Sequence, residues 1–361
     1  MANNPLSFGS IVFQNPDDIG GGGESLHPPF FFNDLNLGRI VDAVTADRDE
    51  YSLKPLFYTR LKSVAAIMYR QEIMHDLENP VLFISIKSFS TQMRSMRLYL
   101  AAAQNRHYKY QKEGCFLRAA EIYCKALSQL QEDLHHAVIN AKGLQTFHAY
   151  LTRHTESDGF TRLRDEADSL QAILSGIRYC VLIREGTVTV RNYDSQEDYS
   201  AVIEQTFAKF RQGRVKDYRV KIPTYADMNH IEAQILDKVA ELNPDAFASL
   251  EEFCTKNKGF TEPILVQFDR EIQFYIAWLE YMEKFRNAGL MFCYPRISER
   301  CKEVSSHNGF DLALADKLIA KSDPARTFTT DFASKVYPFA SQRPPPPVRE
   351  DIPALRFVIS V

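Results

Sequence analysis

The residues best suited to chemistry form one basic run, KFRQGRVKDYRVK, at positions 209–221. Only Asp217 opposes its basic side chains, which gives the run a charge of +5 in a chain of net charge −3. The basic residues are Lys209, Arg211, Arg214, Lys216, Arg219 and Lys221. Side chains at this density can neutralise the phosphates of a nucleic acid duplex without reading its sequence. The alternative is a basic face that is only solvated.

Three further arginines, Arg178, Arg184 and Arg191, lie in or beside the stretch YCVLIREGTVTVRNYD, residues 179–194. Apolar and polar residues alternate with a period of two on both sides of Arg184-Glu185-Gly186. Such alternation around a turn that contains glycine predicts a β-hairpin. We treat these arginines as weaker candidates for phosphate contacts than the basic run.

Motifs for hydrolytic or nucleotide chemistry are missing from the sequence. It has no G-x-S-x-G, no H-E-x-x-H and no glycine-rich loop followed by Lys-Ser or Lys-Thr. Two carboxylates, Asp269 and Glu271, face different sides of an expected helix and are expected to be surface charges. We therefore expect no catalytic residue and no cofactor in this chain.

Metal binding finds little support either. The adjacent side chains of His135 and His136 point about 100° apart on a helix, so they cannot chelate one ion together. A zinc ion held by Cys293, Cys301 and His307 is an alternative, but their spacing matches no common ligand set.

Composition is ordinary for a globular protein, with 45% apolar and 25% charged residues among 361. The net charge excludes a globally basic nucleic-acid binder. No apolar run reaches the roughly 18 residues that span a bilayer, and residues 1–25 do not resemble a signal peptide. The scattered cysteines are expected to be reduced thiols in a cytoplasmic protein without a membrane partner: Cys115, Cys124, Cys180, Cys254, Cys293 and Cys301.

The elements that must position these residues are mostly helices. Apolar residues recur three or four positions apart in each of them. The expected helices cover approximately 34–51, 64–77, 84–103, 116–138, 161–177, the region from 230 onward and 261–289. The last contains the most regular stripe, which is roughly 30 Å long and should require a long antiparallel partner. The stripe comprises Ile264, Phe268, Ile272, Tyr275, Leu279, Met282 and Phe285.

The hairpin between such helices indicates either a small tip domain inserted into a helical arm or a sheet edge in a compact α+β fold.

Four segments of the chain are similar to the MutS family of DNA mismatch repair proteins, in the family's order. These are 31–80 (FFNDLNLGRIV…DLENP), 178–213 (RYCVLIREGTVTV…FRQG), 268–295 (FDREIQFYIAWLEYMEKFRNAGLMFCYP) and 310–318 (FDLALADKL). In that family a helical core sends two long lever helices to a clamp domain that closes over DNA, and an ATPase domain follows.

The resemblance implies a mainly α fold, with an elongated helical core, long lever helices and a small inserted clamp that contains β-structure. Double-stranded DNA is the implied partner, and a homodimer is implied as well. The expected domains are a flexible leader (1–28), the core and outgoing lever (29–177), the clamp (178–224), the returning lever and core (225–290), the start of the ATPase domain (291–323) and a proline-rich, disordered tail (324–361).

The sequence departs from the family at two places. The leader lacks the family's Phe-x-Glu wedge, and the segment after residue 318 enters the tail where the phosphate-binding loop is expected. Without that loop's N–H groups and lysine, ATP and magnesium, which the intact family uses, are not expected to bind productively. We therefore expect a DNA-binding fragment without ATP hydrolysis, and a shifted reading frame near Pro324 would explain the tail.

Two other functions stay open on the sequence. One is a helical scaffold that binds a protein partner through the Ile264–Phe285 stripe and never contacts nucleic acid. The other is a complete ATPase whose phosphate-binding loop is unrecognised. The four consecutive prolines of the tail are also compatible with a ligand for a peptide-recognition domain.

Overall fold

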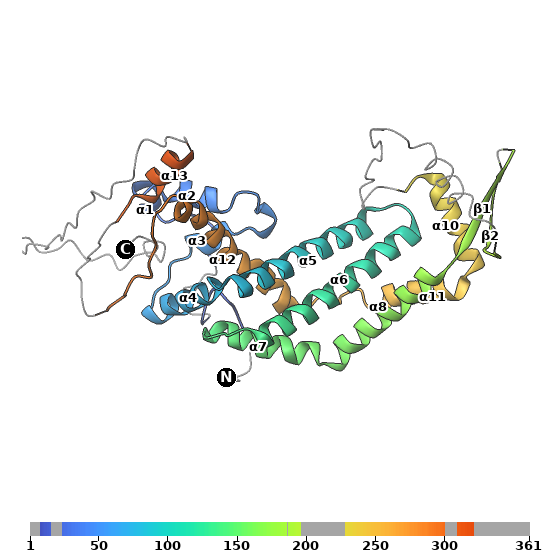
Figure 1. The fold of residues 1–361 in the computed structure, drawn as a ribbon, viewed down its shortest axis with the longest axis horizontal. Coiled ribbons are helices and arrows are strands. Elements are labelled where there is room, and N and C mark those ends of the chain that lie inside the picture. The colour runs from blue at the N-terminus through green and yellow to red at the C-terminus, as the bar shows by residue number, and fades with distance from the viewer. Residues whose placement is uncertain (1–7, 16–23, 186, 196–227, 300–308, 321–361) are drawn as a thin grey trace, which may run out of the picture. The chain divides into compact units, whose positions relative to one another are not determined.

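The computed structural model describes residues 8–15, 24–185, 187–195, 228–299 and 309–320 (Figure 1). Helices dominate these residues, and the sheet among them has two strands, so the predicted mainly α fold class is confirmed. None of the described helices is long and apolar enough to cross a bilayer. The chain divides into two compact units: unit 1 holds Met1–Ser90, Leu127–Thr155 and Thr261–Val361, and unit 2 holds Thr91–Ala126 and Glu156–Phe260.

Unit 1 is organised around α12, Pro263–Asn287, which contacts α2 and α13. Its other helices are α1 (Phe31–Asp34), α2 (Leu37–Val44), α3 (Lys54–Tyr58), α4 (Val64–Leu77), α7 (Lys142–Thr155) and α13 (Leu312–Ala320), with a 3-10 turn at Asp49–Tyr51. Two longer helices, α5 (Pro80–Asn105) and α6 (Lys109–His136), contribute residues to both units. The core of unit 1 therefore collects segments from three parts of the chain.

The predicted stripe on α12 is buried inside unit 1. Phe268, Ile272, Tyr275 and Phe285 are fully inaccessible to solvent, whereas Ile264 is partly exposed. Every residue of 271–279 is buried, so the helix is covered on all sides and not along one seam. The rings that cover it come from different helices and include Phe57, Phe89 and Phe147. The stripe is thus a core element, and the surface proposed for a protein partner is not exposed.

Two sequence predictions are wrong in unit 1. Asp269 and Glu271 are not surface charges, because they are only 1% and 2% exposed. Residues 8–13 fall in the predicted flexible leader, but Phe8, Ile11, Val12 and Phe13 are buried. For Glu271 and the segment the physical reason is shared: the segment brings a hydroxyl and a backbone donor to α12, and these donors offset the burial of the Glu271 carboxylate.

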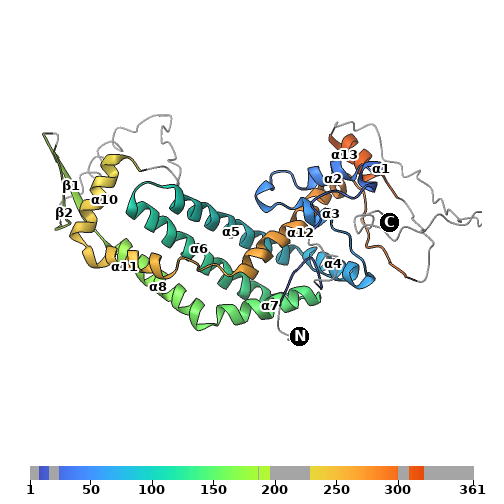
Figure 2. The ribbon, with the colours of Figure 1, turned by 180° about the vertical axis from the view of Figure 1, so that it is seen from behind.

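Unit 2 combines parts of α5 and α6 with the inserted elements. These are α8 (Asp158–Gly176), β1 (Tyr179–Arg184), β2 (Thr187–Asn192), α10 (His230–Leu242) and α11 (Pro244–Lys256). Ring contacts of Tyr110 with Phe247 and of Phe116 with Phe253 join α6 to α11, at centroid distances of 4.8 and 6.3 Å. Both ribbon views show α11 beside α8 and α10 beside the hairpin (Figure 2).

Most predicted helices are present with shifted ends. The single helix predicted for 34–51 is replaced by α1, α2 and the 3-10 turn. Asn36 adopts a left-handed conformation, with φ of 52°, and this interrupts the helix between α1 and α2. Val138, the last residue of the helix predicted on 116–138, lies beyond the end of α6 and is 75% exposed.

Candidate nucleic-acid interface

The predicted hairpin is present and follows α8 directly. Its strands pair antiparallel in a register that runs from Tyr179 opposite Asn192 to Arg184 opposite Thr187. Glu185, the first residue after β1, has a φ of 47°. A positive φ at this position is typical of the tight turns whose twist matches antiparallel strands. The turn therefore lies where the sequence predicts it.

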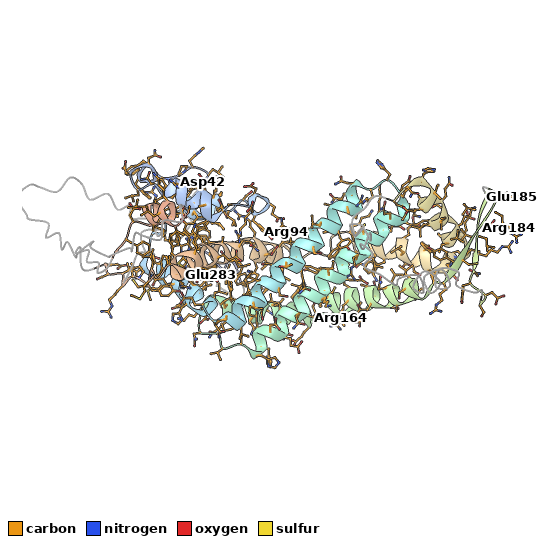
Figure 3. The ribbon with its side chains drawn as sticks, turned by 45° about the horizontal axis from the view of Figure 1, so that its top comes forward. Asp42, Arg94, Arg164, Arg184, Glu185 and Glu283 are labelled. Carbon is orange, nitrogen blue, oxygen red and sulfur yellow. The ribbon has the colours of Figure 1, made fainter. Side chains whose placement is uncertain are left out.

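The register places Arg184 and Arg191 on one face of the hairpin. Directly opposite residues share a face, and Cys180, the partner of Arg191, lies four residues before Arg184 on β1, so the two arginines share that face. With a rise of about 3.3 Å per residue, the two arginines are about 13 Å apart along the strand direction. Both side chains are exposed. Figure 3 shows Arg184 and Glu185 at the turn, with side chains that project away from the ribbon.

Arg178 lies just before β1 and is also exposed. Its carbonyl oxygen accepts a hydrogen bond from the backbone N–H of Tyr193 at 3.4 Å, which extends the ladder by one residue. Within the described ranges, no carboxylate forms an ion pair with Arg178, Arg184 or Arg191. Their guanidinium groups therefore keep donors for an anion, and a bidentate contact to phosphate is the geometry that arginine favours.

Charge around the hairpin is mixed. Residues 178–194 contain three arginines and two acidic residues, Glu185 and Asp194. Helix α10 contacts β2 and carries more acidic than basic side chains. One of its acids, Glu241, pairs with Lys238 at 2.8 Å. An approaching polyanion would therefore be attracted by the hairpin itself and repelled by α10.

The hairpin also exposes apolar side chains. Tyr179, Val181, Leu182 and Val188 are 38–45% exposed. A two-stranded hairpin is marginally stable on its own, and here α10 is the described helix that contacts β2. Of these, Leu182 lies on the same face as Arg184 and Arg191, whereas Tyr179, Val181 and Val188 lie on the opposite face.

The stronger sequence candidates cannot be placed. All of Lys209, Arg211, Arg214, Lys216, Arg219 and Lys221 lie outside the described residues. The structure therefore brings together Arg184 and Arg191, with Arg178 at the base of the same hairpin, and it does not bear on the basic run.

The described residues contain neither a metal-binding group nor a thiol with a lowered pKa. Across the described ranges, no group of three or more His, Cys, Asp or Glu residues is arranged to hold a metal ion. His135 and His136 are exposed, and Cys301 and His307 of the zinc alternative lie outside the described residues. Cys124 and Cys254 are free thiols, and desolvation by burial raises the pKa of each to about 12. Thiols of this kind are poor nucleophiles at neutral pH.

Comparisons of the chain with protein-family models, curated proteins and solved structures found no match. The similarity to the MutS family therefore stays a prediction from the sequence. The site rests on the hairpin geometry and on the charge of the residues that follow it.

Proposed function

We propose that this chain is a MutS-like fragment that binds duplex DNA through the hairpin and the basic run at 209–221, without a catalytic step of its own. The observation that carries the proposal is the exposed hairpin, which displays Arg184 and Arg191 on one face and is followed by a run of charge +5. A cytoplasmic location is part of the proposal and is supported by the free thiols of the described cysteines.

Binding of this kind is electrostatic. Each phosphate that an arginine or lysine neutralises releases condensed counterions, so affinity is weak, independent of base sequence and steeply dependent on salt. Leu182, on the same face as the two arginines, adds contact area to sugars or to a widened groove, but it reads no bases. Burial of the Ile264–Phe285 stripe, apart from Ile264, is the reason we favour DNA binding over a scaffold that binds a partner through it.

Charge-reversal variants test the proposal. Arg184→Glu with Arg191→Glu, and separately Arg214→Glu with Lys216→Glu, should each weaken duplex binding equally across unrelated sequences. Each pair should also reduce the slope of log affinity against log salt by about 2, since about one unit is lost per phosphate contact. Fluorescence anisotropy with a labelled duplex measures both quantities.

A matched control reverses two exposed lysines of unit 1, Lys62→Glu with Lys142→Glu. It makes the same change in net charge but leaves the proposed interface intact. Equal losses in the control and in the test pairs would show that net charge, and not the hairpin or the run, governs binding, and this would refute the assignment.

A further inference from the structure

Residues 8–13, Phe-Gly-Ser-Ile-Val-Phe, lie in unit 1 against α4, α7 and α12 without forming a helix or a strand. Ile11 and Val12 are fully inaccessible to solvent, and Phe8 and Phe13 are only 4% exposed. We call the side chains that hold this segment the peptide seat: Tyr69 and Arg70 of α4, Phe147 of α7, and Gln267, Phe268, Glu271 and Tyr275 of α12.

The seat binds the backbone of the segment residue by residue. The hydroxyl of Tyr69 donates to the carbonyl of Ser10 at 2.7 Å, and the hydroxyl of Tyr275 donates to that of Ile11 at 2.8 Å. Arg70 Nε donates to the carbonyl of Val12 at 2.9 Å. Three successive carbonyl oxygens are thus satisfied by three side chains from two helices.

Glu271 accepts hydrogen bonds from the segment, whereas the three side chains above donate to it. Its Oε2 accepts from the backbone N–H of Ile11 and from Ser10 Oγ, both at 2.8 Å. Its Oε1 accepts from Gln267 Nε2 at 2.7 Å. A buried carboxylate requires donors to offset its lost hydration. The segment supplies two of the three donors, so the seat and the segment complement each other.

Aromatic contacts fix both ends of the segment. The ring of Phe8 meets that of Phe147 edge to face at 5.2 Å and that of Phe268 at 6.2 Å. At the other end, the guanidinium of Arg70 lies 4.9 Å from the centre of the Phe13 ring. Such edge-to-face and cation–π geometries add specificity to main-chain hydrogen bonds.

A core made only for packing would place apolar side chains at these positions. Here five polar side chains bond the backbone of one short segment that bends at Ile11 and Val12, and aromatic contacts select its ends, as in peptide recognition. Four consecutive glycines at 20–23 follow the segment in the sequence.

We propose that the peptide seat is a peptide-binding site for short segments of the pattern aromatic-x-Ser-apolar-apolar-aromatic, and that residues 8–13 occupy it as an exchangeable intramolecular ligand. Because a tethered ligand has an effective concentration in the millimolar range, a free peptide competes only when the tether is cut.

The test uses the full chain with a protease recognition sequence inserted between Gly21 and Gly22, which is cleaved after folding. A fluorescent peptide of residues 7–15 should then exchange with the cleaved fragment and bind at one site per chain. Before cleavage the same peptide should bind at least tenfold more weakly. A Ser10→Ala peptide should lose roughly tenfold in affinity, because it removes a hydrogen bond to a charged group.

Variants of the protein locate the binding. Glu271→Gln should lower the affinity for the labelled peptide. Glu283→Gln, on the same helix but exposed, should leave that affinity unchanged (Figure 3). Equal binding before and after cleavage, or an equal effect of the two variants, would overturn the proposal. Unfolding of unit 1 when the fragment leaves would also overturn it, since the segment would then be an inseparable part of the core.

Hydrogen exchange on the unmodified chain gives an independent readout if the insertion prevents folding. An exchangeable ligand predicts that the amides of Ile11, Val12 and Phe13 exchange faster than those in the middle of α12, because the segment detaches while unit 1 stays folded. Equal protection of the two sets of amides would contradict the proposal.

Discussion

Gly143, on the first turn of α7, shows how a single residue positions a functional contact. A Cβ atom at this position would lie 2.6 Å from the hydroxyl oxygen of Tyr69 and 2.8 Å from Cδ1 of Ile73. Tyr69 is the residue that donates to the carbonyl of Ser10. Only glycine therefore allows α7 to approach α4 closely enough while Tyr69 keeps its place in the peptide seat.

We predict that Gly143→Ala lowers the free energy of unfolding by about 1–3 kcal/mol, the usual cost of overpacking. Urea denaturation measures the change. Gly114→Ala on α6 is the control, since no atom lies within 4 Å of the added Cβ there. It should stabilise the protein by up to about 1 kcal/mol through helix propensity. Stabilisation by both substitutions would show that the contact with Tyr69 is not restrictive.

His148, also on α7, gives unit 1 a sensitivity to acid. Burial lowers its pKa from 6.5, and the nearby His135 lowers it further. Because the folded state disfavours the imidazolium, the unfolded chain binds more protons below about pH 6.5, and stability falls as the pH drops through that value. At pH 8 the residue is neutral in both states and contributes nothing to this dependence.

The expected result for His148→Gln is a smaller loss of stability between pH 8 and pH 5.5 than in the unaltered protein. His27→Gln, at an exposed position of unit 1, serves as the comparison. Thermal unfolding across this pH range provides the measurement. An unchanged pH dependence in His148→Gln would assign the acid sensitivity to other groups.

At the scale of elements, Asp76 links α4 to the start of α7. The side chain is 5% exposed, and its Oδ2 accepts from the backbone N–H groups of Asn140 and Ala141 at 2.8 and 2.7 Å. These amides immediately precede the first residue of α7, where a helix has unsatisfied donors and a partial positive charge. Asp76 therefore acts as a cap supplied by another helix.

Replacing Asp76 by alanine should lower the free energy of unfolding by about 1–3 kcal/mol, because two backbone donors, one of them buried, lose a charged acceptor. Glu72→Ala, an exposed acidic position on the same helix, should change it by less than about 0.5 kcal/mol. Chemical denaturation of both variants decides the point. Equal losses of stability in the two variants would mean that the hydrogen bonds of Asp76 add nothing beyond the loss of one negative charge.

Element types were predictable where one period dominated. The alternation at 179–194 predicted the strands, and the glycine between them predicted the turn. The helix at 261–289 was also predictable, but its surroundings were not. An apolar stripe predicts that one face of a helix is buried. A helix such as α12, which is also covered on its other faces, has the same stripe, so the sequence pattern does not distinguish the two cases.

The wrong predictions for Glu271 and for the leader involve residues that are far apart in the sequence and in contact in the structure. Glu271 was expected on the surface because an isolated buried carboxylate is costly, and its donors at Ser10 and Ile11 are about 260 positions away. No spacing rule detects such a pair. The same contact orders part of the segment predicted as a leader. In the candidate interface, the sequence predicted the hairpin that carries Arg184 and Arg191, and the structure adds that they share a face.

At the scale of the whole molecule, the charge distribution decides how DNA can bind. The basic run carries +5 in a chain of net charge −3, which leaves −8 for the remaining residues. The rest of the surface therefore repels a duplex, and any affinity must come from local contacts. For about six phosphate contacts, affinity should fall on the order of a thousandfold between 50 and 200 mM salt.

The most direct test is a salt titration of the full chain with a labelled duplex of arbitrary sequence, followed by fluorescence anisotropy. We predict saturable binding at 50 mM salt, equal for matched duplexes of different sequence, with log affinity falling linearly against log salt at a slope of roughly −4 to −8. Absence of binding at 50 mM salt, or an affinity that does not change with salt, would contradict the proposal that this chain binds DNA through the hairpin and the basic run.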